Sequence, residues 1–154
     1  LFQEKIGDRK LNLEAIEKYP IDTCYYQNIK NGKDVVLDDG TEIPNEKLTF
    51  DPIPPKNYAF CSDTVYDESI IQNIQNVDVL YHESTFLESE SDLAKKTLHS
   101  TAKQAATIAS KANVKQLVLG HFSTRYESIN IFKEEAETIF PNVFLADDGK
   151  EFEF

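Results

Sequence analysis

The sequence predicts an α/β fold, a mixed sheet with helices packed on it. After residue 56, short apolar segments of strand character alternate with longer segments of helical periodicity, and repeated β-α-β units of this kind build helix-covered sheets. The chain has 154 residues, 40% of them hydrophobic, which is enough for a packed core. No apolar run approaches the ~20 residues of a membrane helix, so we expect no membrane partner.

The first part of the chain predicts short helices followed by a hairpin. Apolar residues at helical spacing predict a helix over 11–18, which Pro20 ends. A second helix is predicted over 22–30. The segments 34–37 and 41–43 flank an Asp-Gly turn, and this pattern is typical of a β-hairpin.

A proline-rich segment over 51–55 divides the chain, because proline fixes φ and removes a backbone hydrogen-bond donor. We therefore expect three parts. These are a helical segment over 1–33, the hairpin and proline-rich linker over 34–56, and an α/β region over 57–154.

The region after the linker is expected to alternate between strands and helices. The predicted strands cover 58–61, 77–81, 116–119 and 143–146, and the predicted helices cover 68–75, 100–112 and 127–140. Ser100 or Thr101 suits the cap at the start of the helix over 100–112.

Polar residues follow three of these strands at once. Asp63 comes after the first strand, His82-Glu83 after the second and His121 after the third. Ligands of α/β sheets gather outside the carboxyl ends of the strands, so these side chains are expected on one rim. His99 precedes a helix start, where backbone N–H groups favour anions. All three histidines of the chain lie in such places, which predicts metal or phosphate chemistry.

Each of these residues also has an ordinary structural interpretation. Asp63 suits a turn, His121 suits a hydrogen-bonded structural histidine, and Glu83 suits a solvated acidic surface. One aspartate with one or two histidines also falls short of the three or four protein ligands that zinc takes. The site prediction therefore depends on the motifs occurring together.

The order of the motifs resembles the second half of the ribonuclease Z family, in the metallo-β-lactamase superfamily. The motifs that carry the resemblance are Ser62-Asp63-Thr64, His82-Glu83-Ser84-Thr85, His99-Ser100-Thr101 and His121-Phe122-Ser123-Thr124-Arg125-Tyr126. The similarity runs from Tyr58 to Asp147. It implies the C-terminal half of a metallo-β-lactamase-type αββα sandwich, preceded by an N-terminal arm and hairpin.

The resemblance also implies roles for single residues. Asp63 would bridge two metal ions and His121 would complete the second metal site. His99 would be catalytic, and we add the hypothesis that Glu83 hydrogen-bonds His99 and sets its tautomer. The residues implied to contact substrate phosphate are Arg125, Thr85, Ser100 and Thr101. Lys30 and Lys33 would lie on the arm that grips transfer RNA.

The activity implied is a zinc-dependent endoribonuclease that removes the 3′ trailer of precursor tRNA by metal-hydroxide attack, leaving a 3′-hydroxyl. Two zinc ions would be held mainly by the N-terminal half of the same protein, which this chain lacks. The chain contains no Met, so we expect it to begin inside a longer gene product. Alone, it is expected to be inactive, to bind zinc weakly or not at all, and to form a homodimer through an apolar sheet face.

Composition adds two further expectations. Cys24 and Cys61 have no metal-site spacing; Cys61 is expected to be buried, and a reducing, cytoplasmic setting fits. The net charge of -11 opposes non-specific RNA binding, which depends on cation–phosphate contacts. The Gly-Pro element of the family's arm is replaced here by Pro20-Ile21-Asp22-Thr23, so the arm would be built differently.

Two alternatives stay open from the sequence. One is another hydrolase of the same fold, a phosphodiesterase or sulfatase, which would share Asp63 and His121 but would not need the two paired loops. The other is a non-enzymatic α/β interaction or phosphorelay module. A phosphorelay receiver needs an acidic pair after its first strand, and the strand before Asp63 supplies one acid.

Overall fold

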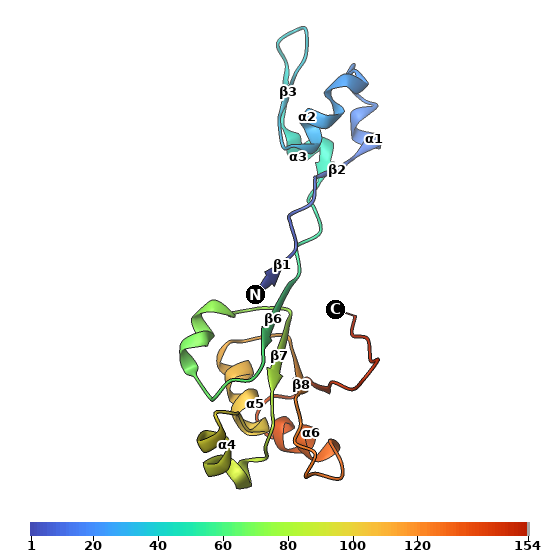
Figure 1. The fold of residues 1–154 in the computed structure, drawn as a ribbon. Helices are drawn as coiled ribbons and strands as arrows, with labels where there is room; N and C mark the ends of the chain where they lie inside the picture. The colour runs from blue at the N-terminus through green and yellow to red at the C-terminus, as the bar shows by residue number, and fades with distance from the viewer. Residues whose placement is uncertain (154) are drawn as a thin grey trace. The chain divides into compact units, whose positions relative to one another are not determined.

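The computed structural model describes residues 1–153, and the chain divides into two compact units. The larger unit comprises residues 1–3 and 56–154, and the smaller comprises 4–55 (Figure 1). The sequence motifs around Asp63, His82, His99 and His121 all belong to the larger unit.

The larger unit is built on a mixed sheet with the order β1-β6-β7-β8-β9. Its strands are β1 (Phe2–Gln3), β6 (Asn57–Cys61), β7 (Val79–Glu83), β8 (Gln116–Gly120) and β9 (Val143–Leu145). β6 to β9 are parallel to their neighbours, and β1 is antiparallel to β6. The predicted mixed sheet is thus confirmed.

The strand register aligns the carboxyl ends of β6, β7 and β8. His82 pairs with Cys61 on one side and with Leu119 on the other, and Glu83 pairs with Gly120. The residues that follow β6 and β8 therefore emerge at the same edge of the sheet as Glu83.

One face of this sheet is covered by helices. The helical elements of the unit are η2 (Glu68–Asn73), η3 (Glu88–Glu90), α4 (Ser91–Thr97), α5 (Ala102–Lys111) and α6 (Asn130–Glu137). Helix α5 presents a buried row of small side chains, Ala102, Ala105, Ala106 and Ala109, so its backbone approaches β7 and β8 closely (Figure 1). Leu80, Leu117 and Leu119 of the strands and Phe132 of α6 complete this core.

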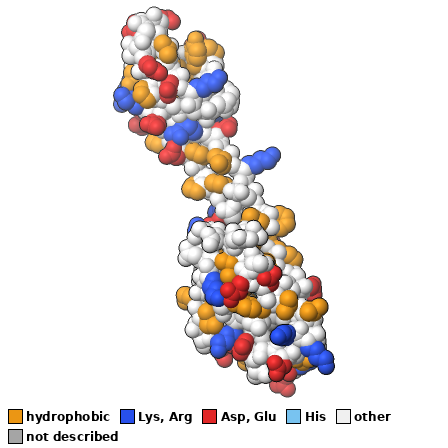
Figure 2. All heavy atoms as spheres, turned by 90° about the vertical axis from the view of Figure 1, so that its left-hand side faces the viewer, with side chains coloured by type: hydrophobic (Ala, Val, Ile, Leu, Met, Phe, Trp, Pro, Cys, Tyr) orange, Lys and Arg blue, Asp and Glu red, His pale blue; other side chains and the backbone are white. Residues whose placement is uncertain are grey.

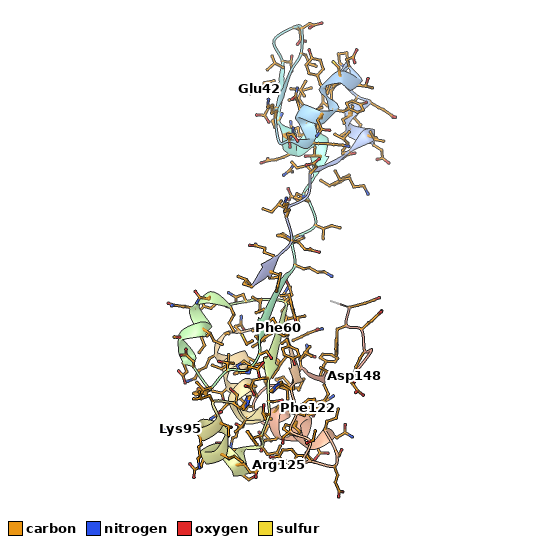
Figure 3. The ribbon with its side chains drawn as sticks, viewed as in Figure 1. Glu42, Phe60, Lys95, Phe122, Arg125 and Asp148 are labelled. Carbon is orange, nitrogen blue, oxygen red and sulfur yellow. The ribbon has the colours of Figure 1, made fainter. Side chains whose placement is uncertain are left out.

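The other face of the sheet carries apolar side chains without a covering helix. Tyr58, Phe60, Tyr81 and Val118 line a hollow of about 400 Å³ there. Phe60 is 52% exposed and projects from β6 (Figure 3). The predicted apolar face is therefore present. The chain after β9 returns toward it, since Phe152 packs edge-on against Phe144 at a centroid distance of 6.2 Å.

The smaller unit has its own core. Its elements are β2 (Lys10–Leu11), α1 (Leu13–Ile16), η1 (Thr23–Tyr25), α2 (Tyr26–Lys30), β3 (Val35–Val36), β4 (Glu42–Ile43), α3 (Asn45–Leu48) and β5 (Thr49–Phe50). The hairpin β3–β4 is confirmed, and β2 pairs with β5. Buried Ile16, Ile29, Val35, Ile43 and Leu48 form the core. The Asn45 amide ties it together by donating to the carbonyls of Ile29 and Lys33.

Several predicted elements differ in extent or type. The predicted helix over 68–75 is the 3₁₀ helix η2, which follows the Asp67 cap and ends at Asn73. The left-handed backbone at Asn76, with φ of +58°, leaves little room for a regular α-helix. The predicted helices over 11–18, 22–30 and 127–140 are shorter, and the second is part 3₁₀. Sequence patterns predict the position of a helix better than the residue at which it ends.

The strand predicted over 77–81 is instead β7 at 79–83, because pairing with β6 continues to His82 and pairing with β8 continues to Glu83. Helix α4 was not predicted; it is polar and buries only Ala94. The expectation that Cys61 is buried is wrong in degree, since the side chain is partly exposed at the end of β6.

Among residues 1–153, no helix has the length and apolar character of a membrane span.

Candidate functional site

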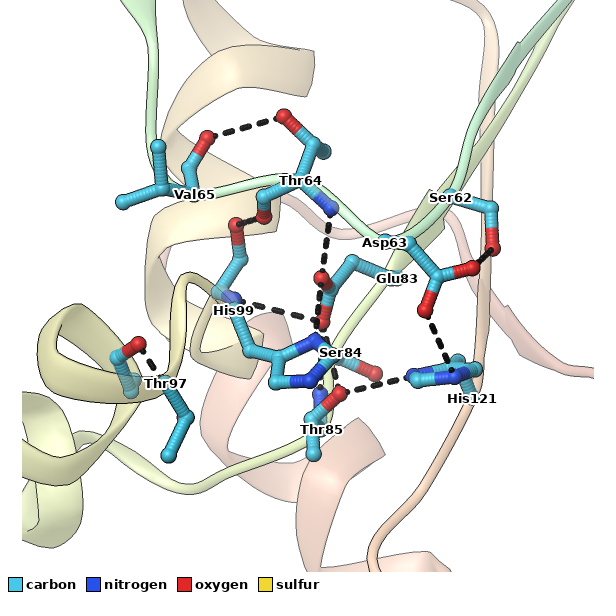
Figure 4. A network of polar contacts seen from close by, with 12 residues as sticks. Ser62, Asp63, Thr64, Val65, Glu83, Ser84, Thr85, Thr97, His99 and His121 are labelled. Atoms are coloured by element: carbon cyan, nitrogen blue, oxygen red, sulfur yellow. Dashed lines mark hydrogen bonds and ion pairs between the residues drawn. The ribbon is translucent and has the colours of Figure 1, made fainter.

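Three of the predicted site residues converge at the carboxyl edge of the sheet. Asp63, His99 and His121 each offer one possible metal-ligating atom, and these atoms lie within 4.8 Å of one another. Asp63 Oδ1 is 3.1 Å from His121 Nε2, and the two imidazole rings are 5.2 Å apart (Figure 4). The juxtaposition expected of these three residues is therefore present.

The backbone turns sharply at each of the three positions. Asp63 lies two residues after Cys61, which ends β6, and His121 directly follows β8; both adopt left-handed conformations with φ of +49° and +59°. Leu98, the residue before His99, ends α4 with φ of +62°. Left-handed backbone costs a non-glycine residue about 1–2 kcal/mol. Strain of this kind persists where surrounding contacts impose it, and it clusters at functional sites.

Glu83 supplies those contacts from the middle of the site. Its carboxylate is fully buried and accepts bonds from the backbone N–H groups of Thr64, Thr85 and Ser100. The Thr85 hydroxyl donates to Oε2 at 2.7 Å, and His99 Nδ1 lies 2.9 Å from Oε1. The predicted hydrogen bond between Glu83 and His99 is thus present (Figure 4), and one carboxylate binds the three loops that form the site.

The environment keeps Glu83 ionised. Burial raises the pKa of this carboxyl, but the hydrogen bonds from Thr85, His99, Ser100 and Thr64 outweigh burial and hold the pKa below its usual value. A buried charge is tolerable only when donors satisfy it in this way. Glu83 is therefore a fixed negative charge behind the cluster, contrary to the alternative of a solvated surface acid.

Thr85 connects Glu83 to His121 and fixes the orientation of the His121 ring. Its hydroxyl has one proton, which it donates to Glu83, so it must accept at its second contact, 2.8 Å from His121 Nδ1. His121 therefore carries its proton on Nδ1, and Nε2 faces Asp63. When the ring is neutral, two lone pairs meet there across 3.1 Å, and a cation is the natural occupant of such a gap. The donor set of one carboxylate and two imidazoles suits zinc and similar divalent metals.

The hydroxyls of Ser100 and Thr101 have internal partners in place of the predicted phosphate contact. Ser100 donates to the carbonyl of Thr64 at 2.7 Å. Thr101 donates to Glu88 and caps α5 through a capping box with Gln104. Both residues are fully buried. Together with Thr85, they hold the loops together, and the geometry does not favour phosphate contact by any of the three.

Arg125 lies beside the site but is occupied. Its guanidinium pairs with Glu90 at 2.8 Å and lies over the Phe86 ring, 5.0 Å from the centroid. The Tyr126 hydroxyl also donates to Glu90. The prediction of phosphate contact by Arg125 therefore requires that it exchange this partner.

Lys30 and Lys33 belong to the smaller unit and not to this cluster. Lys30 ends α2, and its carbonyl accepts from the backbone N–H of Arg9. Arg9, Lys10 and Lys30 line a shallow hollow there. The sequence had not singled out Arg9, whose guanidinium bonds Thr49 and Asp51.

His82 does not lie on the rim where the sequence placed it. As part of β7 it points into the interior, is fully buried, and contacts its neighbour's carbonyl through Nδ1 at 2.8 Å. Within residues 1–153, its Nε2 has no hydrogen-bond partner. Burial lowers the pKa of His82. It is a neutral core residue, because strand alternation turns it away from Glu83.

Comparison with known proteins adds the wider context. No protein-family model matches the chain. The structure resembles the metallo-β-lactamase fold protein YhfI from Bacillus subtilis, with 25% identity and a TM-score of 0.60 over 64% of this chain and 40% of that one. It also resembles a long form RNase Z from yeast, with 26% identity and a TM-score of 0.54 over 61% of this chain and 13% of that one. The helix-backed sheet thus has the metallo-β-lactamase fold.

Within that class, the chain is a relative of ribonuclease Z, as the motifs indicated. It is 48% identical over 149 residues to Ribonuclease Z of Parabacteroides distasonis, covering 97% of this chain and 49% of that protein. It is 49% identical over 146 residues to Ribonuclease Z of Phocaeicola vulgatus, covering 95% of this chain and 47% of that protein. The chain thus spans about half the length of these curated relatives.

Replacing Glu83 with glutamine should destabilise the larger unit and release His99. The amide keeps the shape but turns one acceptor oxygen into a donor, so buried N–H groups lose their partner. We expect a loss of about 1–3 kcal/mol in unfolding free energy, measured by urea denaturation, and a mixed His99 tautomer by ¹⁵N NMR. Glu134→Gln, at an exposed position of α6, is the matched control. Equal midpoints for both variants would show that Glu83 is not the central contact.

Stability should fall on acidification in part because of His82. Its pKa is lowered from 6.5 in the folded state, so the unfolded chain binds the proton more readily. The contribution is complete above pH 6.5 and is lost as the pH falls below that value. Urea unfolding between pH 7.5 and 5 should show this loss, and His82→Asn, which keeps a donor but cannot titrate, should reduce it. An identical pH dependence in the variant would contradict this assignment.

Proposed function

We propose that the protein to which this chain belongs hydrolyses the phosphodiester that joins a 3′ trailer to precursor tRNA and leaves a 3′-hydroxyl. The observation that carries the proposal is the convergence of Asp63, His99 and His121 around a buried, ionised Glu83. The similarity to ribonuclease Z over nearly the whole chain supports the choice of substrate. Because the chain spans about half of these relatives, the remaining half would belong to the same active centre.

Zinc is the metal that we propose, as two ions in the complete enzyme. Asp63 and His121 would be the ligands from this chain, since their facing atoms are 3.1 Å apart and the His121 tautomer directs a lone pair toward Asp63. A bound ion of this kind supplies Lewis acidity and lowers the pKa of its water. This chain alone offers fewer donors than a closed zinc site requires, so weak or absent binding is expected.

His99 has the geometry of a general acid. Its Nδ1–H is held by Glu83 at 2.9 Å, which leaves Nε2 to carry the proton that the leaving O3′ takes up. The carboxylate behind the ring orients it, as in other histidine–carboxylate pairs that transfer protons. The His99 side chain is 24% exposed, so a phosphate at the rim could reach it. Glu83 acts through His99 and is a positioning residue.

Arg125 would bind substrate phosphate by exchanging its carboxylate partner. A guanidinium binds phosphate through the same two-pronged geometry as carboxylate, and stacking over Phe86 would keep it in place during the exchange. Lys30 and Lys33 of the smaller unit would contribute to the transfer-RNA arm. On the side shown in Figure 2, basic side chains are mixed with acidic ones, so we expect RNA affinity to come from local contacts and to be strongly salt-dependent.

The open sheet face would be covered by the remaining half in the complete protein. When the chain is alone, we propose that two copies associate through this face as a homodimer, since an apolar patch of this kind seeks a partner. A reducing, cytoplasmic setting remains our expectation for both forms.

The decisive experiment is cleavage of a precursor tRNA with a 3′ trailer by the full-length protein. Activity should be lost with a chelator and restored by zinc. Asp63→Asn and His121→Ala should each lower the rate by about 100-fold or more, whereas Asp92→Asn, at an exposed position of α4, should not. Hydrolysis of simple phosphodiesters or sulfate esters without tRNA cleavage would favour a different hydrolase of the same fold.

Association of the isolated chain can be tested at Phe60, which is 52% exposed on the open face. Sedimentation of the 154-residue chain should show a concentration-dependent dimer, and Phe60→Lys should shift it to monomer because a charge cannot be buried there. Phe50→Lys is the matched control, since Phe50 is 54% exposed in the smaller unit. Weak interfaces assemble at about 100 μM. A parent chain that stays monomeric at that concentration would therefore rule out the dimer.

A further inference from the structure

Tyr81 of β7 lies directly on the bare backbone of Gly120, the last residue of β8. A Cβ atom at position 120 would be 2.3 Å from Tyr81 Oη and 2.7 Å from the ring atoms Cε2 and Cζ. Side chains do not tolerate such distances. Any residue other than glycine at 120 would therefore displace the phenol, and the two positions form a matched pair.

The position of this ring follows from the register. Tyr81 pairs with Val118, and Gly120 lies two residues further on the same face, so the phenol leans toward the carboxyl edge of the sheet. On its other side the ring stacks on Phe60, with centroids 4.6 Å apart and planes at 19°. Because the ring lies between Phe60 and Gly120, its hydroxyl lies beside Gly120, the residue that precedes His121.

The hydroxyl lies over Gly120, at the edge of the sheet that carries His121. No hydrogen bond to Tyr81 Oη exists among residues 1–153. Tyr81, Gly120 and His121 line one hollow of about 550 Å³, together with the hydroxyl-bearing Ser123 and Thr124. Burial, and then the charges of Glu83 and Asp63, raise the Tyr81 pKa. The phenol is therefore a neutral donor at physiological pH and lies within the field of both carboxylates.

We propose that the Tyr81 hydroxyl donates a hydrogen bond to an oxygen of the phosphodiester bound beside His121, in a position that only glycine at 120 permits. This rests on the proposed function and adds a substrate-contacting residue to it. Asp147 and Asp148 also border the hollow and would repel an anion. A neutral donor next to a metal held by Asp63 and His121 offsets that repulsion without adding a charge that must be desolvated.

Tyr81→Phe in the full-length protein isolates the hydroxyl, because the ring and its stacking remain. The expected result is a fall in kcat/KM for precursor tRNA of about 10-fold or more, the usual value of a bond to a charged group, with zinc content and urea midpoint unchanged. Tyr66→Phe, which removes a hydroxyl that bonds Glu68 in the same unit, is the control. An unchanged kcat/KM in Tyr81→Phe would overturn the proposal.

A second measurement does not depend on turnover. With tyrosines labelled at ¹³Cζ, the Tyr81 signal, identified by its absence in Tyr81→Phe, should shift when inorganic phosphate is added to the zinc-loaded protein. In Gly120→Ala the ring is displaced and the shift should vanish. Tyr81→Val/Gly120→Ala, in which the smaller side chain leaves room for the new methyl group, should regain the parent's urea midpoint and show that Gly120→Ala acts through the ring.

The two measurements separate this inference from the proposed function. If the parent protein cleaves precursor tRNA and Tyr81→Phe does so equally well, the function stands and the role of Tyr81 falls. If the parent cleaves no precursor tRNA, the function falls, and the phosphate titration decides on Tyr81 by itself. A Tyr81 signal that phosphate leaves unmoved overturns the inference in that case.

Discussion

The arrangement of the site depends on one buried carboxylate. Glu83 sits at the end of the central part of the sheet and receives donors from the loops after β6, after β7 and before α5. A buried charge is destabilising unless hydrogen-bond donors satisfy it. Each loop is therefore held where its backbone N–H group can donate to the Glu83 carboxylate. The left-handed turns at Asp63 and His121 follow from that demand. The network also fixes the proton positions of both histidines, which links folding stability directly to the chemistry available at the rim.

Much of this could be predicted from the sequence, and the reasons are local. Apolar runs followed at once by polar residues marked the carboxyl ends of β6 and β8 and placed Asp63 and His121 at one edge, and the resemblance to the family added His99. The bond between Glu83 and His99 also followed from the two paired loops. What could not be predicted was set by neighbours distant in sequence. β7 continues two residues beyond the end of the predicted strand, so His82 is a strand residue. Because neighbouring residues of a strand point to opposite faces of the sheet, its side chain points inward.

The threonine and serine hydroxyls show the same limit in another form. Thr85, Ser100 and Thr101 stand in motifs that resemble phosphate-binding loops, yet each hydroxyl completes an internal bond, to Glu83, Thr64 and Glu88. Which donor reaches which acceptor depends on the closure of the loops around Glu83, and residue type alone does not encode it. The close approach of Tyr81 to Gly120 is likewise a property of register between β7 and β8.

The negative charge of the chain bears on how such a site would meet RNA. Several carboxylates near the sheet are already neutralised: Glu90 by Arg125, Glu68 by Lys111 and Asp78 by Lys115. Asp63 differs, since its side chain is 70% exposed and faces His121. A divalent ion held there would reverse the sign of the potential at the point where a phosphate must approach. Under the proposed function, metal occupancy and RNA affinity would thus be coupled, and the acidic body would repel nucleic acid everywhere except at the loaded centre and the arm.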